Sequence, residues 1–203
     1  MIARDDITGL ILAGGRGSRM GGTDKGLQPF QGTPMVEHTL RRLSPQAGPM
    51  LINANRNPDR YAAFGVPVIG DVIPDFAGPL AGMLAGLAHC QTRWMVTAPC
   101  DTPFLPIDLV ARLAAAIATE NADIAVPVTV DADGRRRLQP VFCLMPVTIA
   151  DGLRAYVEAG NRKIESWITS QRLAQVMFED ALAFANINTL DELRQHEADA
   201  GPG

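Results

Sequence analysis

With 203 residues the chain is long enough for one large domain, and its formal net charge of −4 argues against general binding to nucleic acid or to membrane surfaces. Hydrophobic residues make up 47% of the chain and aromatic residues 5%, as in an α/β protein with an aliphatic core. The three cysteines form no C-x-x-C pair, the first residues lack the features of a signal peptide, and no apolar run is long enough to span a membrane. We therefore expect a cytoplasmic protein without disulfides or a zinc site.

The first distinctive feature is a glycine-rich loop that follows a short apolar run. Residues 10–13 predict a buried strand, and residues 14–26 then contain six glycines, two arginines and a lysine. Glycine lets another group approach the main chain closely, and exposed backbone N–H groups together with cationic side chains attract an anion. The loop therefore favours a polyphosphate ligand over a neutral one, with a simple surface loop as the alternative.

Neither of the two best-known phosphate-binding motifs matches this loop. The dinucleotide fingerprint G-x-G-x-x-G, started at Gly15, places Met20 where the third glycine is required. The Walker A pattern, started at Gly17, places Thr23 where the lysine is required. The sequence thus predicts a phosphate-binding loop of a third kind.

Strands and helices alternate along the rest of the chain. The alternation predicts βαβ units and a mostly parallel sheet, and Asp133-Gly134 signals a hairpin turn with residues 141–144 as partner or neighbour. We expect a single-domain α/β fold, a Rossmann-like three-layer sandwich with a small antiparallel insertion. The expected helices are 35–43, 57–64, one ending at 89, 107–118, 148–159, 163–171 and 190–197, and the expected strands after the first are 50–55, 66–69, 94–98, 124–128, 141–144, 173–178 and 185–188.

Polar residues stand at or just beyond the ends of three of the predicted strands, at Asn53, Asp71 and Asp101. Ligands of open parallel sheets bind beyond the carboxyl ends of the strands, so these residues and the glycine loop should meet at one edge. Asp101 stands between Pro99 and Pro103, and a carboxylate held there beside phosphates favours Mg²⁺. The alternative for Asp101 is an N-cap for the helix that begins near residue 107.

The charged residues of the loop suggest how a triphosphate would be held. Lys25 and Arg19 would supply positive charge to it, unless they are solvated surface residues. Asp24 is either a second carboxylate or, as we favour, an ion-pair partner for its neighbours. Asn53 and Asp71 could select a guanine base or simply form Asx-turns at the strand ends.

Three further places have both a functional and a structural interpretation. Gly78 begins a Gly-Pro-Leu-Ala-Gly turn that would form a wall of the base pocket or a helix start packed on the sheet. Asn186 and Asn188 would point the same way from a strand, toward a ligand or into strand-end hydrogen bonds. Residues 135–137 are three arginines, either a solvated hairpin tip or a contact for an anionic second substrate.

These motifs resemble those of a known family. Residues 12–27 look like the N-terminal signature of nucleotidyltransferases, and their Met-Gly-Gly-x-Asp-Lys segment is similar to that of the molybdenum cofactor guanylyltransferases. The agreement extends in order along the chain, through Asn53, Gly70-Asp71, 78–82, 99–104 and 186–189.

The resemblance implies transfer of GMP from GTP to the terminal phosphate of molybdopterin-bound molybdenum cofactor, with Mg²⁺ as the metal. It implies one domain for residues 1–203, with nucleotide binding mainly in 1–105 and the cofactor substrate mainly in 106–203. We also expect a monomer that binds no nucleic acid and no membrane, with a molybdoenzyme or cofactor chaperone as its protein partner. Carried over by position, the catalytic residues would be Asp101, Lys25 and Arg19; the nucleotide contacts Leu12, Ala13, Gly14, Gly15, Lys25, Asn53, Asp71, Gly78 and Asp101; the metal ligand Asp101; and the contacts to the cofactor substrate Gly22, Asn186 and Asn188.

Three alternatives remain on sequence alone. A cytidylyltransferase acting on the same cofactor would share the loop chemistry, and base specificity does not follow from the residues. A sugar-1-phosphate nucleotidyltransferase usually has a longer chain. A non-catalytic module that binds the nucleotide or cofactor would be distinguished by its failure to release pyrophosphate.

Overall fold

The computed structural model describes residues 2–14, 24–73, 78–131 and 133–186. Its strands are β1 (Ile7–Leu12), β2 (Pro29–Phe30), β3 (Thr33–Pro34), β4 (Met50–Asn53), β5 (Val68–Ile69), β6 (Trp94–Pro99), β7 (Ile124–Val130), β8 (Arg136–Leu138), β9 (Leu144–Pro146) and β10 (Leu173–Met177). Its α-helices are α1 (Met35–Leu43), α2 (Pro58–Ala62), α3 (Pro79–His89), α4 (Leu109–Glu120), α5 (Ala150–Glu158) and α6 (Ile164–Ile168). Two short 3₁₀ turns matter below, η3 (Lys25–Leu27) and η6 (Leu182–Phe184).

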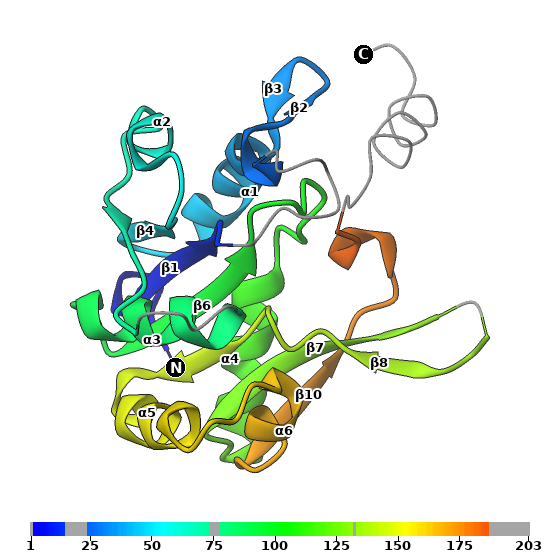
Figure 1. The fold of residues 1–203 in the computed structure, drawn as a ribbon. Helices are drawn as coiled ribbons and strands as arrows, with labels where there is room; N and C mark the ends of the chain where they lie inside the picture. Colours follow the sequence, from blue (N-terminus) through cyan, green and yellow to red (C-terminus); the bar gives the residue numbers. More distant parts are fainter. Residues whose placement is uncertain (1, 15–23, 74–77, 132, 187–203) are drawn as a thin grey trace.

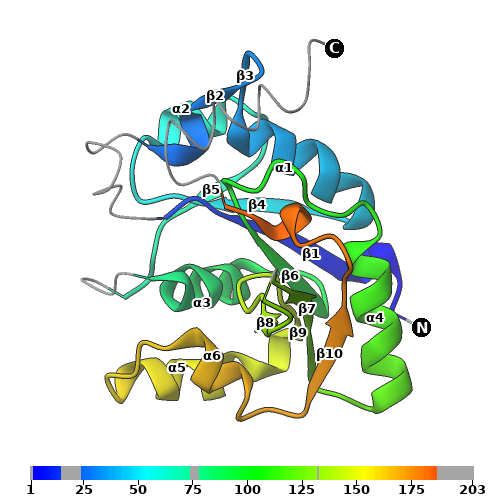
Figure 2. The same cartoon turned by 90° about the vertical axis from the view of Figure 1, so that its right-hand side faces the viewer.

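The centre of the molecule is an eight-stranded sheet with helices on both faces (Figures 1 and 2). Seven strands follow the order β10-β7-β9-β6-β1-β4-β5, and β8 pairs with β7. The pairs β1–β4, β1–β6, β4–β5 and β7–β10 are parallel, whereas β9 runs antiparallel to both β6 and β7. This arrangement confirms the predicted three-layer α/β fold.

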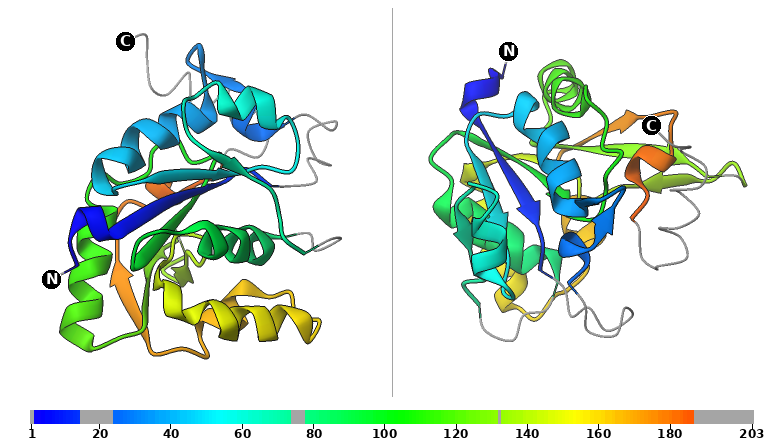
Figure 3. Two further views of the ribbon diagram at one scale, coloured as in Figure 1. Left: turned by 90° about the vertical axis from the view of Figure 1, so that its left-hand side faces the viewer. Right: turned by 90° about the horizontal axis from the view of Figure 1, so that it is seen from above.

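The two faces of the sheet form two separate cores. Side chains of α1 and α4 pack on one face, and those of α3, α5 and α6 pack on the other. Figure 3 shows α2 and the β2–β3 hairpin on the side of the sheet that α1 covers, and Tyr61 of α2 belongs to that core. No helix in the described ranges is both long and apolar enough to cross a membrane.

β1 occupies the middle of the sheet and is buried along its whole length. It begins three residues before the predicted strand, because Thr8 and Gly9 interrupt the apolar run without leaving the core. Thr8 is 1% exposed, and its hydroxyl bonds to that of Thr92 at 2.8 Å, so the polar atom is satisfied inside the sheet. A central parallel strand tolerates such residues when their hydrogen bonds are made.

The antiparallel insertion differs in part from its prediction. The turn at Asp133-Gly134 is present, with Gly134 at φ +75°, but the hairpin partner of β7 is β8. The predicted strand 141–144 corresponds to β9, which starts at Leu144 and lies between β7 and β6, so it is a neighbour of β7, as the second of the two predicted alternatives had it. The three arginines at the hairpin are exposed, and Arg137 pairs with Asp131 at 3.0 Å, as expected for a solvated tip.

The end of the described chain also corrects one prediction. The expected strand 185–188 does not begin at Ala185, whose N–H donates to the carbonyl of Leu182 and so closes η6. Asn186 is the last residue that the structure describes, and Asn188 and the predicted helix 190–197 lie outside the described residues.

Candidate active site

The candidate site lies at the carboxyl edge of β1, β4 and β6. Leu12 is in register with both Asn53 and Pro99, so these three strand ends are level with one another. Beyond the strand, the N–H of Ala13 donates to the carbonyl of Asn53 at 2.8 Å, and the N–H of Cys100 donates to the carbonyl of Leu12 at 3.1 Å. The start of the glycine loop is thus held between two neighbouring strand ends, as the sequence predicted.

Gly14 leads the chain past the side chains of β4. A Cβ atom at this position would lie 3.2 Å from Oδ1 of Asn53 and 3.6 Å from Nδ2 of Asn55. The backbone of Gly14 therefore runs close to two amides. Of the other loop residues in the predicted site, Gly15, Arg19 and Gly22 lie outside the described residues.

Asn53, Asn55 and Asp71 form one hydrogen-bonded cluster. Nδ2 of Asn53 donates to Oδ1 of Asp71 at 3.0 Å, and Nδ2 of Asn55 donates to Oδ2 at 2.7 Å. The N–H of Asp71 in turn donates to Oδ1 of Asn55 at 2.8 Å. Both oxygens of the carboxylate are therefore fixed, and each retains a lone pair for a ligand.

The sequence predicted two members of this cluster and missed the third. Asn55 stands two residues after Asn53, at the spacing that places side chains on one side of an extended chain. That spacing is the signal by which Asn55 could have been found.

Asp101 and Lys25 approach each other across the edge of the sheet. Nζ of Lys25 lies 3.6 Å from Oδ2 of Asp101, whose side chain is 10% exposed. Burial raises the pKa of Asp101, and the ammonium of Lys25 opposes that rise. Asp101 is not a helix N-cap, because α4 begins at Leu109 with Asp108 in the cap position.

Within the described residues, the carboxylate of Asp24 accepts hydrogen bonds from two neutral donors. It accepts a short hydrogen bond from the hydroxyl of Tyr61 and another, at 3.0 Å, from Nδ2 of Asn57. Burial is the main cause that raises the pKa of Tyr61, followed by the nearby Cys100 and Asp24. The Tyr61 hydroxyl therefore stays protonated and acts as a donor. Neither tyrosine nor asparagine was predicted here from the sequence.

Gly78 begins the turn into α3, one turn before Gly82, where an added Cβ would lie 2.4 Å from Oδ1 of Asn53. Gly78 directly precedes α3 with φ at +143°, a conformation that favours glycine, and a Cβ there would meet no atom within 4 Å. Asn186 follows η6, on the side of the molecule where Phe184 packs against Phe178, the residue after β10.

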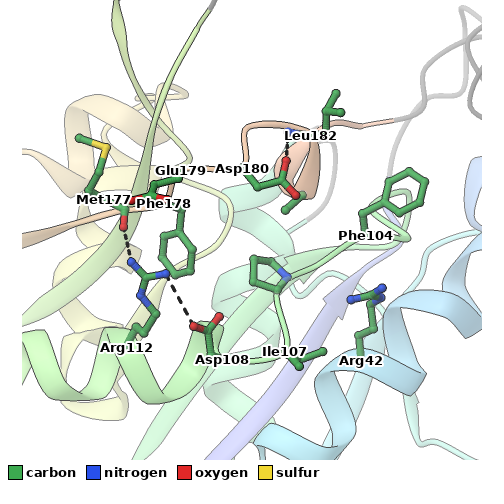
Figure 4. Close-up of a pocket in the computed structure, with 12 residues that line it drawn as sticks. Arg42, Phe104, Ile107, Asp108, Arg112, Met177, Phe178, Glu179, Asp180 and Leu182 are labelled. Carbon is green, nitrogen blue, oxygen red and sulfur yellow. Dashed lines mark hydrogen bonds and ion pairs between the residues drawn. The ribbon is translucent and has the colours of Figure 1, made fainter. Parts of the chain in front are cut away.

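A groove of about 940 Å³ lies on that side, between α1, the loop before α4, the end of β10, and η6 (Figure 4). The guanidinium of Arg112 stacks 3.8 Å from the ring centre of Phe178 and pairs with Asp108 at 3.6 Å. Ile107 and Leu182 expose apolar side chains at its rim. None of the described candidate residues lines this groove, and no sequence motif indicated it.

The donor set at the sheet edge suits a metal that takes most of its ligands from elsewhere. Within the described ranges, no group of three or more His, Cys, Asp or Glu side chains could hold a metal ion. Asp101 supplies one buried carboxylate beside a cation. Mg²⁺ commonly binds one or two carboxylates and completes its shell with phosphate oxygens and water, so this donor set fits it.

The chain is similar in sequence to a family model and to curated relatives. Residues 9–176 match the family model described as MobA-like NTP transferase domain. A molybdenum cofactor guanylyltransferase of Cupriavidus pinatubonensis is 74% identical over 198 residues, 98% of this chain and 100% of the relative. One of Cupriavidus metallidurans is 70% identical over 203 residues, the whole of both chains. This chain belongs to the molybdenum cofactor guanylyltransferases.

As a member of the guanylyltransferase family, the chain is a nucleotidyltransferase, and the resemblance of residues 12–27 is confirmed. Solved structures agree on the fold. Molybdopterin-guanine dinucleotide biosynthesis protein A from Archaeoglobus fulgidus superposes with a TM-score of 0.77 at 22% identity, covering 95% of this chain and 98% of its own. A 4-diphosphocytidyl-2C-methyl-D-erythritol synthase from Anaerococcus prevotii gives a TM-score of 0.75 at 13% identity, covering 98% and 100%.

Proposed function

We propose that the chain transfers GMP from GTP to the terminal phosphate of molybdopterin-bound molybdenum cofactor, releasing pyrophosphate. The observation that carries this proposal is the pair of Lys25 and Asp101, 3.6 Å apart at the strand edge where the glycine loop leaves β1. The pair combines a cation for phosphate oxygens with a buried carboxylate for a metal. The high identity to relatives that are named molybdenum cofactor guanylyltransferases supports the choice of substrates.

Lys25 neutralises charge on the triphosphate, and this charge grows as the α-phosphorus is attacked. A fixed cation contributes most where charge develops, because it needs no reorganisation at that moment. Arg19 adds a second cation to the same loop. The attacking group is a phosphate oxygen of the cofactor substrate, in line with the departing pyrophosphate.

The protein does not supply the nucleophile. Cys100 is next to Asp101, but burial and then the Asp101 and Asp24 carboxylates raise the pKa of its thiol. A neutral buried thiol is a poor nucleophile. The contribution of the protein is therefore to position the two substrates and to balance their charge.

Asp101 holds Mg²⁺ in this proposal. The carboxylate of Asp101 would hold the ion, which would supply positive charge that stabilises the pyrophosphate leaving group. Nζ of Lys25 lies 3.6 Å from Oδ2 of Asp101, and this ion pair leaves lone pairs of the carboxylate oxygens for the ion.

The cluster around Asp71 selects the base. Amides of Asn53 and Asn55 fix both carboxylate oxygens of Asp71 and leave them as acceptors. Guanine presents two adjacent N–H donors on one edge, whereas cytosine presents one amino group. A fixed carboxylate therefore favours GTP over CTP. Leu12, Ala13, Gly14, Gly15 and Gly78 complete the nucleotide contacts.

The remaining assignments follow the same division of the chain. Residues 1–105 bind mainly the nucleotide and residues 106–203 mainly the cofactor substrate, with Gly22, Asn186 and Asn188 toward the pterin. We infer a cytoplasmic monomer that passes its product to a molybdoenzyme or a cofactor chaperone. The free state of Cys90, Cys100 and Cys143 suits a reducing compartment.

The direct test is incubation of the purified protein with GTP, Mg²⁺ and molybdenum cofactor. We expect pyrophosphate release and a pterin product heavier by one GMP, detected by mass spectrometry. CTP in place of GTP should give at most a few per cent of the rate. An equal or faster reaction with CTP would contradict the assignment of the base. If no pyrophosphate is released with either GTP or CTP, the enzymatic proposal is contradicted.

A further inference from the structure

Lys25 is flanked by two residues that contact the same side chain. Tyr61 of α2 is fully buried, and its hydroxyl donates a short hydrogen bond to the carboxylate of Asp24. Asn57, at the N-cap of α2, donates to the other oxygen of Asp24 at 3.0 Å. The residue before the lysine is therefore held by two donors from one short helix.

The residue after the lysine is held by packing. A Cβ atom at Gly26 would lie 2.6 Å from the hydroxyl oxygen of Tyr61 and 2.9 Å from Sγ of Cys100. Only a glycine lets these groups approach the backbone so closely. The Tyr61 hydroxyl thus lies against both neighbours of Lys25, Asp24 and Gly26. Cys100, which also lies close to Gly26, directly precedes Asp101.

This arrangement bears on where the ammonium of Lys25 lies. A lysine side chain has four rotatable bonds, so the direction of its Cα–Cβ bond limits the region that its Nζ can reach. That direction is set by the backbone of residues 24–26. Small displacements of a catalytic group are costly, since rate depends steeply on its position relative to the reacting atoms.

We propose that Tyr61 is a positioning residue, whose hydroxyl fixes the turn at residues 24–26 and so keeps Lys25 beside Asp101. The inference rests on the proposed function, in which Lys25 binds the triphosphate. It concerns the hydroxyl alone, because the ring of Tyr61 belongs to the core and would pack there without it.

Tyr61→Phe removes this hydroxyl and keeps the ring. The chain offers a matched control in its other tyrosine, Tyr156, whose hydroxyl makes an exposed hydrogen bond to the carbonyl of Lys163 at 3.0 Å. We expect Tyr61→Phe to lower kcat/KM for GTP about tenfold, since a hydrogen bond to a charged acceptor is lost. Tyr156→Phe should stay within about twofold of the wild type.

A double-mutant cycle with Lys25→Ala separates positioning from general stabilisation. If Tyr61 acts through Lys25, then Tyr61→Phe should change kcat/KM by less than about twofold in the Lys25→Ala background, because the group that it positions is gone. A purely structural role would give the same tenfold loss in both backgrounds. Such additivity, or wild-type activity of Tyr61→Phe, would overturn the inference.

The double-mutant cycle can also be run if Tyr61→Phe does not fold, and a separate measurement shows whether the proposed role of Lys25 itself has failed. If Tyr61→Phe does not fold, Asp24→Ala, which removes the acceptor of the same hydrogen bond, takes its place and should show the same non-additivity. Additive losses for Asp24→Ala would overturn the inference. GTP affinity measured by calorimetry distinguishes a failure of the proposed function. Unchanged GTP affinity and activity in Lys25→Ala would refute the role of Lys25 itself, and the inference would fall with it.

Discussion

At the scale of single residues, Asp101 gives the most direct test of the proposed chemistry. Asp101→Asn keeps the shape of the side chain and removes the charge, so we expect kcat/KM to fall by about 100-fold or more in the presence of Mg²⁺. The fold should be retained, because burial raises the pKa of Asp101 and the substitution removes a charge that is costly to bury. Pyrophosphate release and thermal unfolding measure the two effects, and near-normal turnover would exclude Asp101 as the metal ligand.

Residues also differ in how far the sequence could predict them. The sequence could predict four site residues because they stand near strand ends or belong to a motif: Asn53, Asp71, Lys25 and Asp101. Parallel pairing then brings the strand ends to one edge of the sheet. The role of Tyr61 could not be predicted from the sequence. Tyr61 reaches Asp24 from 37 positions away along the chain, and nothing in local periodicity encodes a contact of that range.

At the scale of elements, close packing of α3 on the sheet depends on a small residue in the helix. A Cβ atom at Gly86 would lie 2.4 Å from Cδ2 of Leu10 and 2.8 Å from Sδ of Met95. Alanine favours a helix over glycine by about 1 kcal/mol, but overpacking a core costs roughly 1–3 kcal/mol. We therefore expect Gly86→Ala to lower the free energy of unfolding in a urea titration.

Gly152 provides the control for that prediction. It lies in α5, where an added Cβ would meet no atom within 4 Å, so Gly152→Ala should raise the free energy of unfolding by about 0.5–1 kcal/mol. Stabilisation by both substitutions would mean that α3 can move away from β1, contrary to the close packing described here.

The adjacent parallel strands β7 and β10 are joined by an ion pair at their amino ends. Nε of Arg172 donates to Oδ2 of Asp123 at 2.9 Å, and Nη2 donates to Oδ1 at 2.5 Å. These hydrogen bonds lower the pKa of Asp123. The pair therefore adds stability above the unfolded-state pKa of an aspartate, and this stability is lost as the pH falls through the lower folded-state value.

We accordingly expect Asp123→Asn to destabilise the protein slightly at pH 7 and not at all at strongly acidic pH. Urea titrations of both proteins at several pH values measure the difference in the free energy of unfolding. A difference that stays constant down to acidic pH would contradict the role of the ionised pair. The effect should also shrink in high salt, since the pair is partly exposed.

Elements were easier to predict than their partners. Apolar periodicity located most of the helices and strands, but it could not show that β9 would insert between β6 and β7. The apolar run 141–144 predicts a strand, but it does not indicate whether that strand runs parallel or antiparallel to its neighbours. Its antiparallel placement depends on contacts between residues far apart in the chain, such as that between Leu144 and Val96.

At the scale of the whole molecule, the two expected halves of the chain share one sheet. Residues 1–105 contain β6, and residues 106–203 contain β9, which pairs with it. The N–H of Cys143 donates to the hydroxyl of Thr97 at 3.2 Å across this pair. Separation of the halves would break this ladder and expose both cores, so we expect the described chain to unfold as one cooperative unit.

Two buried thiols can test this cooperativity. Cys100 belongs to the core on one face of the sheet and Cys143 to the core on the other, and burial raises the pKa of both. Neither should react with a thiol reagent until the surrounding structure opens. With Cys90, which is half-buried, replaced by serine, we expect the two remaining labelling rates to rise with the same dependence on denaturant concentration.

The common slope should equal that of global unfolding followed by circular dichroism, because one opening event exposes both thiols. A shallower slope for Cys143 would mean that residues 106–203 open while the nucleotide half remains folded. In that case β9 would leave β6 without unfolding the rest of the sheet, and the chain would have to be treated as two units. Equal slopes would instead tie the proposed nucleotide and cofactor halves to a single folding equilibrium.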